Sequence, residues 1–200
     1  MDAASHQPPR AARGWITFSN AVLFIELRLA ALLLAVLLCV ILTNVVTRYA
    51  GMPIYWIDEL AVIAMVWLGF IGASAMSRLR LDFAITFLAG AVPLRLGAVV
   101  RIGGIALVVL FGFALAWMCW LWLDPVGIAK AGFDGRAFAG ATFNFVYTET
   151  TMTLGWPRWA VMCVIPIFAI TMMLHGIASL IEEIWGCDHT AISGFEEASV

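Results

Sequence analysis

Charged residues are scarce in this sequence, and they are absent from four long segments. Asp, Glu, Lys and Arg make up only 12% of the 200 residues, whereas soluble domains carry about 25%. The uncharged segments are Leu29–Thr47, Leu60–Ser77, Ile102–Leu123 and Trp159–Ile181. Each is close to the roughly 20 residues with which a helix crosses about 30 Å of hydrocarbon. Since 64% of the residues are hydrophobic, no soluble core could bury them, and the sequence predicts an all-α membrane protein with four transmembrane helices.

Several other signals are missing, and each absence excludes a class of protein. The 11 basic and 13 acidic residues leave a net charge of -2, so we expect no nucleic-acid partner. The four cysteines form no C-x-x-C or other metal-ligand spacing, which argues against a metal site. No Ser/His/Asp set or carboxylate pair is expected at one depth, so we predict no enzyme activity and no cofactor on this chain.

A cleavable signal peptide is also not expected. The first apolar segment begins at Leu29, is too long for a signal peptide and ends at Arg48 without a small-residue cleavage site. We therefore divide the chain into three parts. Residues 1–28 are a predicted cytoplasmic tail with an interfacial segment around Trp15 and Phe18, residues 29–183 are the four-helix transmembrane domain, and residues 184–200 are a cytoplasmic C-terminal tail.

The distribution of basic residues predicts the orientation. With both termini in the cytoplasm, the cytoplasmic side holds Arg10, Arg13, Arg28, Arg78, Arg80, Arg95 and Arg101, and the outer side holds Arg48, Lys130, Arg136 and Arg158. This excess inside favours N-in and C-in. Between the second and third helices, residues 82–96 are apolar, too short to span and bracketed by arginines. We expect an in-plane interfacial helix there, with Arg78, Arg80 and Arg95 at lipid headgroups.

Residues 124–156 form the longest predicted connection. The segment is rich in Gly and Thr, and aromatic residues alternate at Phe143, Phe145 and Tyr147. This alternation is compatible with a short strand or with an interfacial segment.

Few polar residues lie within the predicted spans. They are mainly Asn44, Ser74, Thr171 and His175. We interpret His175 either as a neutral histidine that bonds a neighbouring helix or reaches headgroups, or as a proton or metal ligand. A haem-bearing redox anchor would need a second axial ligand, which another subunit would have to supply because His6 and His189 lie in the tails.

The chain also shows no inverted internal repeat of the kind that complete secondary transporters have. This favours a helper subunit over an autonomous channel or carrier. Small residues recur at four-residue intervals at Gly69, Ala73 and Ser77, and again at Gly112 and Ala116. Such rows permit close packing of membrane helices.

The predicted hairpin between the first two helices holds the densest group of polar residues. Asn44 and Arg48 are one helical turn apart, and the short connection must bring Arg48 near Asp58 or Glu59. Either these residues serve the helix ends and the lipid headgroups, or they lie in an interface with another subunit. A water-exposed ion pair would contribute only about 0–1 kcal/mol.

The order of several motifs resembles the small membrane (Q, DctQ-like) subunit of tripartite ATP-independent periplasmic (TRAP) transporters. The motifs are Asn44–Tyr49, the W-x-x-E-L pattern of Trp56–Leu60, the W-x-x-F-x-G-A-like Val66–Ala73, Leu81–Asp82 with Leu94–Arg95, Leu154–Pro157 and Ile165–Ile167. Together they cover nearly the whole chain from Phe18 to Glu183.

The resemblance implies a scaffold subunit in the bacterial inner membrane, within a sodium-coupled, binding-protein-dependent secondary transporter for organic acids. Its partners would be a large membrane (M) subunit, which carries the substrate and sodium sites, a periplasmic binding protein, and membrane lipids. Assembly would involve Asn44, Arg48, Trp56, Glu59, Trp67, Gly69 and Ala73.

Overall fold

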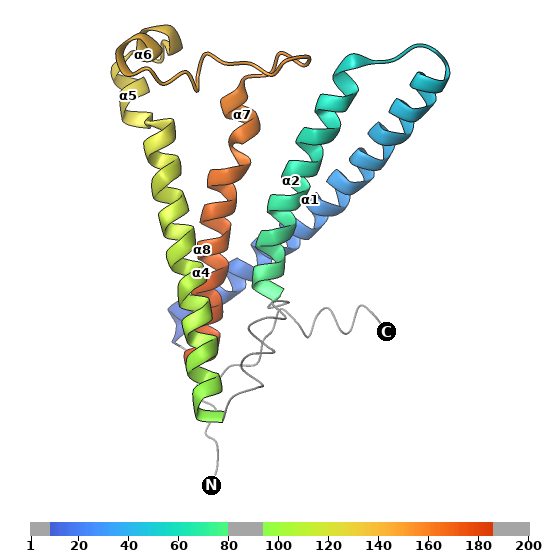
Figure 1. Cartoon of the computed structure of the whole chain (residues 1–200). Helices are drawn as coiled ribbons and strands as arrows, with labels where there is room; N and C mark the ends of the chain where they lie inside the picture. Colours follow the sequence, from blue (N-terminus) through green and yellow to red (C-terminus); the bar gives the residue numbers. More distant parts are fainter. Residues whose placement is uncertain (1–8, 80–93, 186–200) are drawn as a thin grey trace. The chain divides into compact units, whose positions relative to one another are not determined.

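The computed structural model describes residues 9–79 and 94–185, and this part of the chain is helical (Figure 1). The helices are α1 (Arg10–Tyr49), α2 (Tyr55–Leu79), α4 (Leu94–Leu123), α5 (Pro125–Lys130), α6 (Gly135–Thr142), α7 (Arg158–Met162) and α8 (Val164–Trp185). Within these ranges the extended structure is a single isolated bridge between Thr150 and Pro157. The all-α prediction is confirmed.

Four helical segments are long and apolar enough to cross a membrane: Arg10–Tyr49, Tyr55–Leu79, Leu96–Lys130 and Arg158–Trp185. Each contains one of the four uncharged sequence segments. A helix satisfies its own backbone hydrogen bonds, which is why it can cross hydrocarbon that offers no other partners. The prediction of four spanning helices is therefore confirmed.

The first helix starts much earlier than the sequence suggested. α1 begins at Arg10, so the residues around Trp15 and Phe18 continue the same helix instead of forming a separate segment before Leu29. Charge at Glu26 and Arg28 had marked the boundary, yet Glu26 is buried against other helices. The predicted in-plane helix at 82–96 lies outside the described residues, except for its last three positions, which begin α4.

The long connection after α4 contains two short helices, α5 and α6, and no strand among its residues 124–156. Phe143, predicted to start an alternating run, instead ends α6 in the left-handed region with φ of 55°. The prediction of a short strand is therefore wrong. The alternative, that this segment lies at the membrane interface, stays a prediction.

Proline explains the break between α7 and α8. Pro157 is the N-cap of α7, and Pro166 lies in the first turn of α8. Because Pro166 has no backbone N–H, it cannot bond the Met162 carbonyl four residues earlier. The helix accordingly breaks at Cys163.

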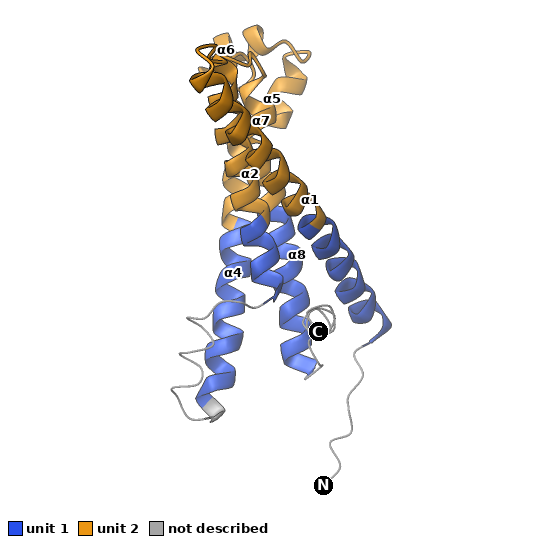
Figure 2. Cartoon of the chain, turned by 90° about the vertical axis from the view of Figure 1, so that its right-hand side faces the viewer, with its two compact units in different colours: residues 1–27, 72–113, 169–200 blue, residues 28–71, 114–168 orange. Residues whose placement is uncertain are grey.

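The chain divides into two compact units, which Figure 2 colours separately. Unit 1 comprises residues 1–27, 72–113 and 169–200, and unit 2 comprises residues 28–71 and 114–168. In unit 1, α4 and α8 approach closely at glycines. A Cβ added at Gly112 would lie 2.7 Å from Met173 Cγ, and one added at Gly176 would lie 2.6 Å from Val109 Cγ2.

In unit 2, α2 and α8 pack through Phe70 and Phe168, whose rings meet edge to face with centroids 5.3 Å apart. A second, separate core within this unit joins α5 and α6. It contains the buried residues Ile128, Phe138 and Val146.

Candidate functional site

The α1–α2 hairpin holds a connected polar group in unit 2. Arg48 Nη2 lies 2.6 Å from Asp58 Oδ2, and Arg48 Nε donates to Asn44 Oδ1 over 3.0 Å. The amide nitrogen of Asn44 donates to Asp58 Oδ1 over 2.5 Å. The Arg48 and Asp58 side chains are 61% and 53% exposed, so water screens the pair and its contribution to stability is about 0–1 kcal/mol.

Glu59 has a different role from its neighbour Asp58. Its carboxylate accepts hydrogen bonds from the backbone N–H groups of Met152, Thr153 and Leu154 over 2.7–2.8 Å. It also accepts one from the Thr153 hydroxyl at 2.6 Å. Glu59 therefore ties the start of α2 to the turn before α7.

That turn is closed by its own contacts. The Thr151 N–H donates to the Trp156 carbonyl over 2.8 Å, and the Trp156 N–H donates to the Thr151 hydroxyl over 2.9 Å. An ion pair of 2.6 Å joins Arg158 to Glu149 at its base. Sequence reasoning missed this use of Glu59, because the donors are backbone groups more than 90 positions away and no residue type marks them.

The other predicted assembly residues lie on α2. Trp67 donates from Nε1 to the Val161 carbonyl of α7 over 2.9 Å, so it makes a contact within the chain. Trp56 is 45% exposed. Gly69 and Ala73 are exposed, and a Cβ added at Gly69 would meet nothing within 4 Å. The structure thus leaves this row of small residues uncovered by the described part of the chain.

Unit 1 contains a cluster of polar side chains, which we call the buried polar cluster because all its members except the half-buried Asn20 and Thr171 are buried. Its members are Ser19, Asn20 and Glu26 of α1, Ser74 and Arg78 of α2, and Thr171, His175, Ser179 and Glu182 of α8. On α2 and α8 they recur three or four residues apart, so one face of each of these helices supplies them. On α1, Ser19 and Glu26 are seven residues apart, which is two helical turns.

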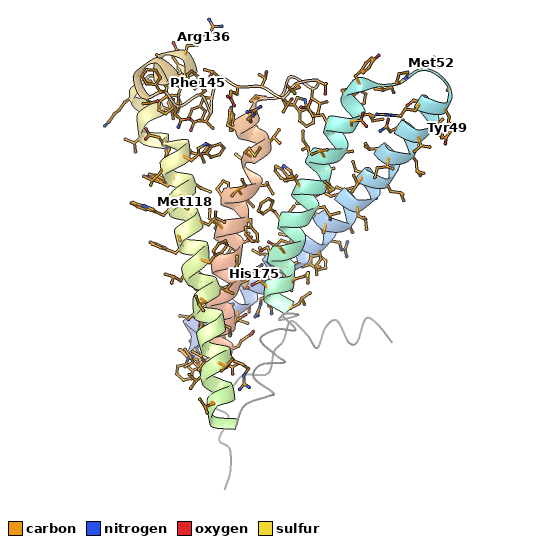
Figure 3. All side chains as sticks on the ribbon, in the orientation of Figure 1. Tyr49, Met52, Met118, Arg136, Phe145 and His175 are labelled. Atoms are coloured by element: carbon orange, nitrogen blue, oxygen red, sulfur yellow. The ribbon has the colours of Figure 1, made fainter. Side chains whose placement is uncertain are left out.

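His175, labelled in Figure 3, is completely buried in this cluster. Its Nδ1 lies 2.7 Å from the Ser19 hydroxyl, and its Nε2 lies 2.9 Å from Glu26 Oε2. The other oxygen of Glu26 accepts from the Ser74 hydroxyl over 2.7 Å. Ser74 in turn lies 2.7 Å from the Thr171 hydroxyl. His175 of α8 therefore contacts two side chains of α1, as expected of a histidine that bonds a neighbouring helix.

Arg78 is 1% exposed, and each of its five N–H groups can be assigned an acceptor. Nη1 and Nη2 donate to the two oxygens of Glu182 over 2.7 and 2.6 Å. Nε and Nη2 donate to Asn20 Oδ1 over 3.1 and 2.7 Å, and Nη1 reaches the Ser179 hydroxyl at 3.4 Å. This two-point pairing with a carboxylate is the strong geometry for arginine.

The predicted contact of Arg78 with lipid headgroups is therefore wrong for this structure, because its guanidinium is buried between helices and paired with Glu182. Arg80 lies outside the described residues, as does the side chain of Arg95, so their headgroup contacts stay predictions. Sequence reasoning also missed Glu26 and Glu182, which both lie outside the uncharged segments that it used to find the spans. The four-residue spacing of Thr171, His175 and Ser179 on α8 was the signal that could have revealed the cluster.

In the described residues, the polar side chains of the buried polar cluster form hydrogen bonds with one another. The two carboxylates, the guanidinium and the imidazole each bond another helix of the same chain. Among these residues no group of three or more His, Cys, Asp or Glu side chains is placed to hold a metal ion. The cluster can hold helices in register.

Four helices able to span a membrane, three of them joined by buried polar contacts, define a multi-pass membrane protein. Residues 37–185 match the family described as tripartite ATP-independent periplasmic transporters, DctQ component. The chain belongs to this family and is a small subunit of a TRAP transporter. The family is one of transporter components, not of enzymes. No curated protein and no solved structure matches the chain.

Proposed function

We propose that this small subunit is a scaffold in the bacterial inner membrane, with both termini in the cytoplasm. It pairs with a large membrane subunit that carries the sodium and substrate sites. A periplasmic binding protein delivers the cargo, which we expect to be an organic acid. This chain itself then binds no cofactor, sodium or substrate.

The buried polar cluster is the observation that carries this proposal. A site that binds and releases a polar solute needs polar groups that can exchange a protein partner for the solute. Here Arg78, Glu182 and His175 direct their polar atoms to neighbouring helices at hydrogen-bond distances. Breaking such buried pairs costs several kcal/mol, roughly 3–5 for a buried ion pair. Fixed contacts of this kind support a rigid frame better than a moving carrier.

The uncovered face of α2 is the surface we assign to the large subunit. It presents Val62, Met65, Gly69, Ala73 and Met76, which are all exposed and spaced three or four residues apart. In lipid, small residues on such a face allow a partner helix to approach closely and gain dispersion contacts. A side chain added at Gly69 would meet only that partner, because its Cβ direction is open.

The α1–α2 hairpin provides the second part of the proposed interface. Arg48 and Asp58 contribute little while they are exposed, so their value would come from burial against the large subunit. Asn44 holds Arg48 and Asp58 in one arrangement, and Trp56, which is 45% exposed, lies two residues before Asp58. Glu59 acts indirectly in this proposal, by fixing the turn at 149–157.

A bulky double variant on α2 tests the scaffold and its interface. Gly69→Leu with Ala73→Leu should reduce co-purification of the large subunit and lower sodium-dependent uptake in liposomes that contain the complete transporter. The isolated chain should keep its helix content and stability. Gly103→Leu is the matched control, since Gly103 is also exposed with an open Cβ direction but lies on α4.

Two results would refute the proposal. Normal co-purification and uptake with the double variant would show that this face of α2 does not contact the large subunit. Solute uptake by liposomes that contain this chain alone would establish an autonomous carrier instead of a scaffold. The redox-anchor alternative predicts haem absorbance in the purified chain, whereas both ring nitrogens of His175 already contact Ser19 and Glu26.

A further inference from the structure

Residues 124–147 form a small folded module at the C-terminal end of α4, which we call the α5–α6 module. Asp124 caps α5 by accepting from the Gly127 N–H over 2.9 Å. Asp134 caps α6 in the same way, from the Arg136 N–H over 2.8 Å. Phe138 of α6 packs edge to face on Tyr147, which follows that helix, with ring centroids 5.6 Å apart. The module thus has defined helix starts and its own core.

Two side chains fasten the module to the last turn of α4. The Asn144 amide donates to the Trp122 carbonyl over 2.7 Å, and the Tyr147 hydroxyl donates to the Leu123 carbonyl over 2.6 Å. These carbonyls lack partners within α4 because the helix ends there. Burial raises the pKa of Tyr147, and the Asp124 carboxylate raises it further, which keeps the hydroxyl a donor. Phe143 and Phe145 flank Asn144, so they are held at the level of the end of α4.

Phe143 and Phe133 combine strain with exposure. Their φ angles are 55° and 61°, a left-handed conformation that is unfavourable for residues with a bulky side chain. Their side chains are nonetheless 83% and 79% exposed, so packing within the chain does little to offset the strain. Asp124 adopts a left-handed conformation too, but a short polar side chain tolerates it better. The two phenylalanine side chains therefore point outward and add little packing stability to the module.

The surroundings of Phe143 and Phe145 indicate what covers them. α4 belongs to a membrane-spanning segment, and its last two turns expose Trp117, Trp120 and Trp122. Exposed tryptophans at a helix end are typical of the boundary between hydrocarbon and headgroups. Figure 3 shows Phe145 on the side of the module nearer to α4, while Arg136 projects from its outer edge. Phe145 and Arg136 thus lie on different sides of the module.

We propose that the α5–α6 module is a membrane-interface anchor that inserts Phe143 and Phe145 between the phospholipid headgroups of the adjacent leaflet. The partner is the lipid surface itself. Burial of the rings in the interface supplies the free energy that the chain's own packing does not, and the tryptophans of α4 continue the same apolar band. The module fixes the depth and rotation of α4.

Spin labels in the full chain, reconstituted in phosphatidylcholine nanodiscs, test this anchor. In a variant whose four cysteines are replaced by alanine, single labels replace Phe143, Phe145 or, as control, Arg136. The ratio of collisions with oxygen to collisions with a water-soluble nickel chelate rises with depth in lipid. We expect this ratio to be several-fold higher at positions 143 and 145 than at 136. Equal, water-like ratios at all three positions would overturn the proposal.

A second measurement keeps the native cysteines. A photo-reactive benzoylphenylalanine at position 143 should crosslink to phospholipid in nanodiscs, as seen by mass spectrometry, and the same residue at position 136 should not. The experiment is repeated with the large subunit present. A crosslink from position 143 to protein alone, with none to lipid in either sample, would identify a protein-docking surface and overturn the lipid anchor.

Discussion

Removing one member of the Arg78–Glu182 pair should cost the chain a large part of its stability. Both side chains are 1% exposed and joined by two charge-assisted hydrogen bonds. In Glu182→Leu, the Arg78 guanidinium stays buried with only the neutral acceptors Asn20 and Ser179. An uncompensated buried charge of this kind costs about 3–5 kcal/mol. We expect a loss of stability for Arg78→Met as well, because the Glu182 carboxylate loses both hydrogen bonds that Arg78 donates to it.

The double variant Arg78→Met with Glu182→Leu should be far less damaging than either single change. It removes both charges, and replacing a complete buried pair by apolar groups is often nearly neutral. The remaining cost comes from the Asn20 carbonyl and the Ser179 hydroxyl, each of which loses the hydrogen bond that Arg78 donates to it, at about 0.5–1.5 kcal/mol for each lost bond. The signature of the pair is therefore strong non-additivity between the two changes.

Reversible unfolding of the purified chain in detergent measures these differences, with loss of helical circular dichroism as the readout. The control pair is Arg101–Glu183, which lies in the same unit with 2.8 Å between Nε and Oε1, but with Arg101 45% exposed. Arg101→Met should change the free energy of unfolding by about 1 kcal/mol or less. If the two single changes at Arg78 and Glu182 simply add in the double variant, the buried pair does not stabilise the chain as argued.

Three further predictions concern other parts of the chain. Glu59→Gln should weaken the four hydrogen bonds to residues 152–154 and speed amide exchange there, because a neutral amide is a weaker acceptor than a carboxylate. Unchanged exchange would contradict the role of Glu59. Gly112→Val should destabilise the α4–α8 contact by about 1–3 kcal/mol in the same unfolding assay, because its Cβ would meet Met173. The control Gly103→Val should leave the stability unchanged. Equal effects of the two substitutions would refute the close approach of α4 and α8 at Gly112. His175→Leu should destabilise the chain by about 1–3 kcal/mol, because Glu26 Oε2 loses its contact with His175 and only Oε1 keeps its hydrogen bond, from Ser74. A stability equal to that of the unsubstituted chain would show that Glu26 does not depend on His175.

The spanning helices could be predicted because a bilayer imposes one simple requirement on the chain. Backbone groups must be paired within each helix, so length and lack of charge suffice to find the spans. The contact of Arg48 with Asp58 was predictable for a similar reason, since a short connection leaves few arrangements. Both inferences use neighbours in the sequence.

The buried polar cluster was beyond these arguments, because its partners are distant in the sequence. Arg78 and Glu182 are 104 positions apart, and each ends an apolar segment, where a charge ordinarily reaches water or headgroups. A rule that treats charge as the border of a span therefore places both outside the bundle. Burial of Arg78 becomes favourable only because Asn20, Ser179 and Glu182 together match its five donors. These acceptors come from α1 and α8, so the sequence around Arg78 in α2 does not reveal them.

The same reasoning explains why a scaffold would keep such a cluster. Apolar side chains pack acceptably in several registers, so a purely apolar contact among α1, α2 and α8 would tolerate sliding. A shift of α8 by one turn would move His175 away from Glu26 and Glu182 away from Arg78, leaving buried polar groups unpaired at a cost of about 1–3 kcal/mol or more for each. Polar contacts spaced along the helix thus select one register. A subunit that must stay fixed while its partner moves gains more from that selectivity than from added apolar area.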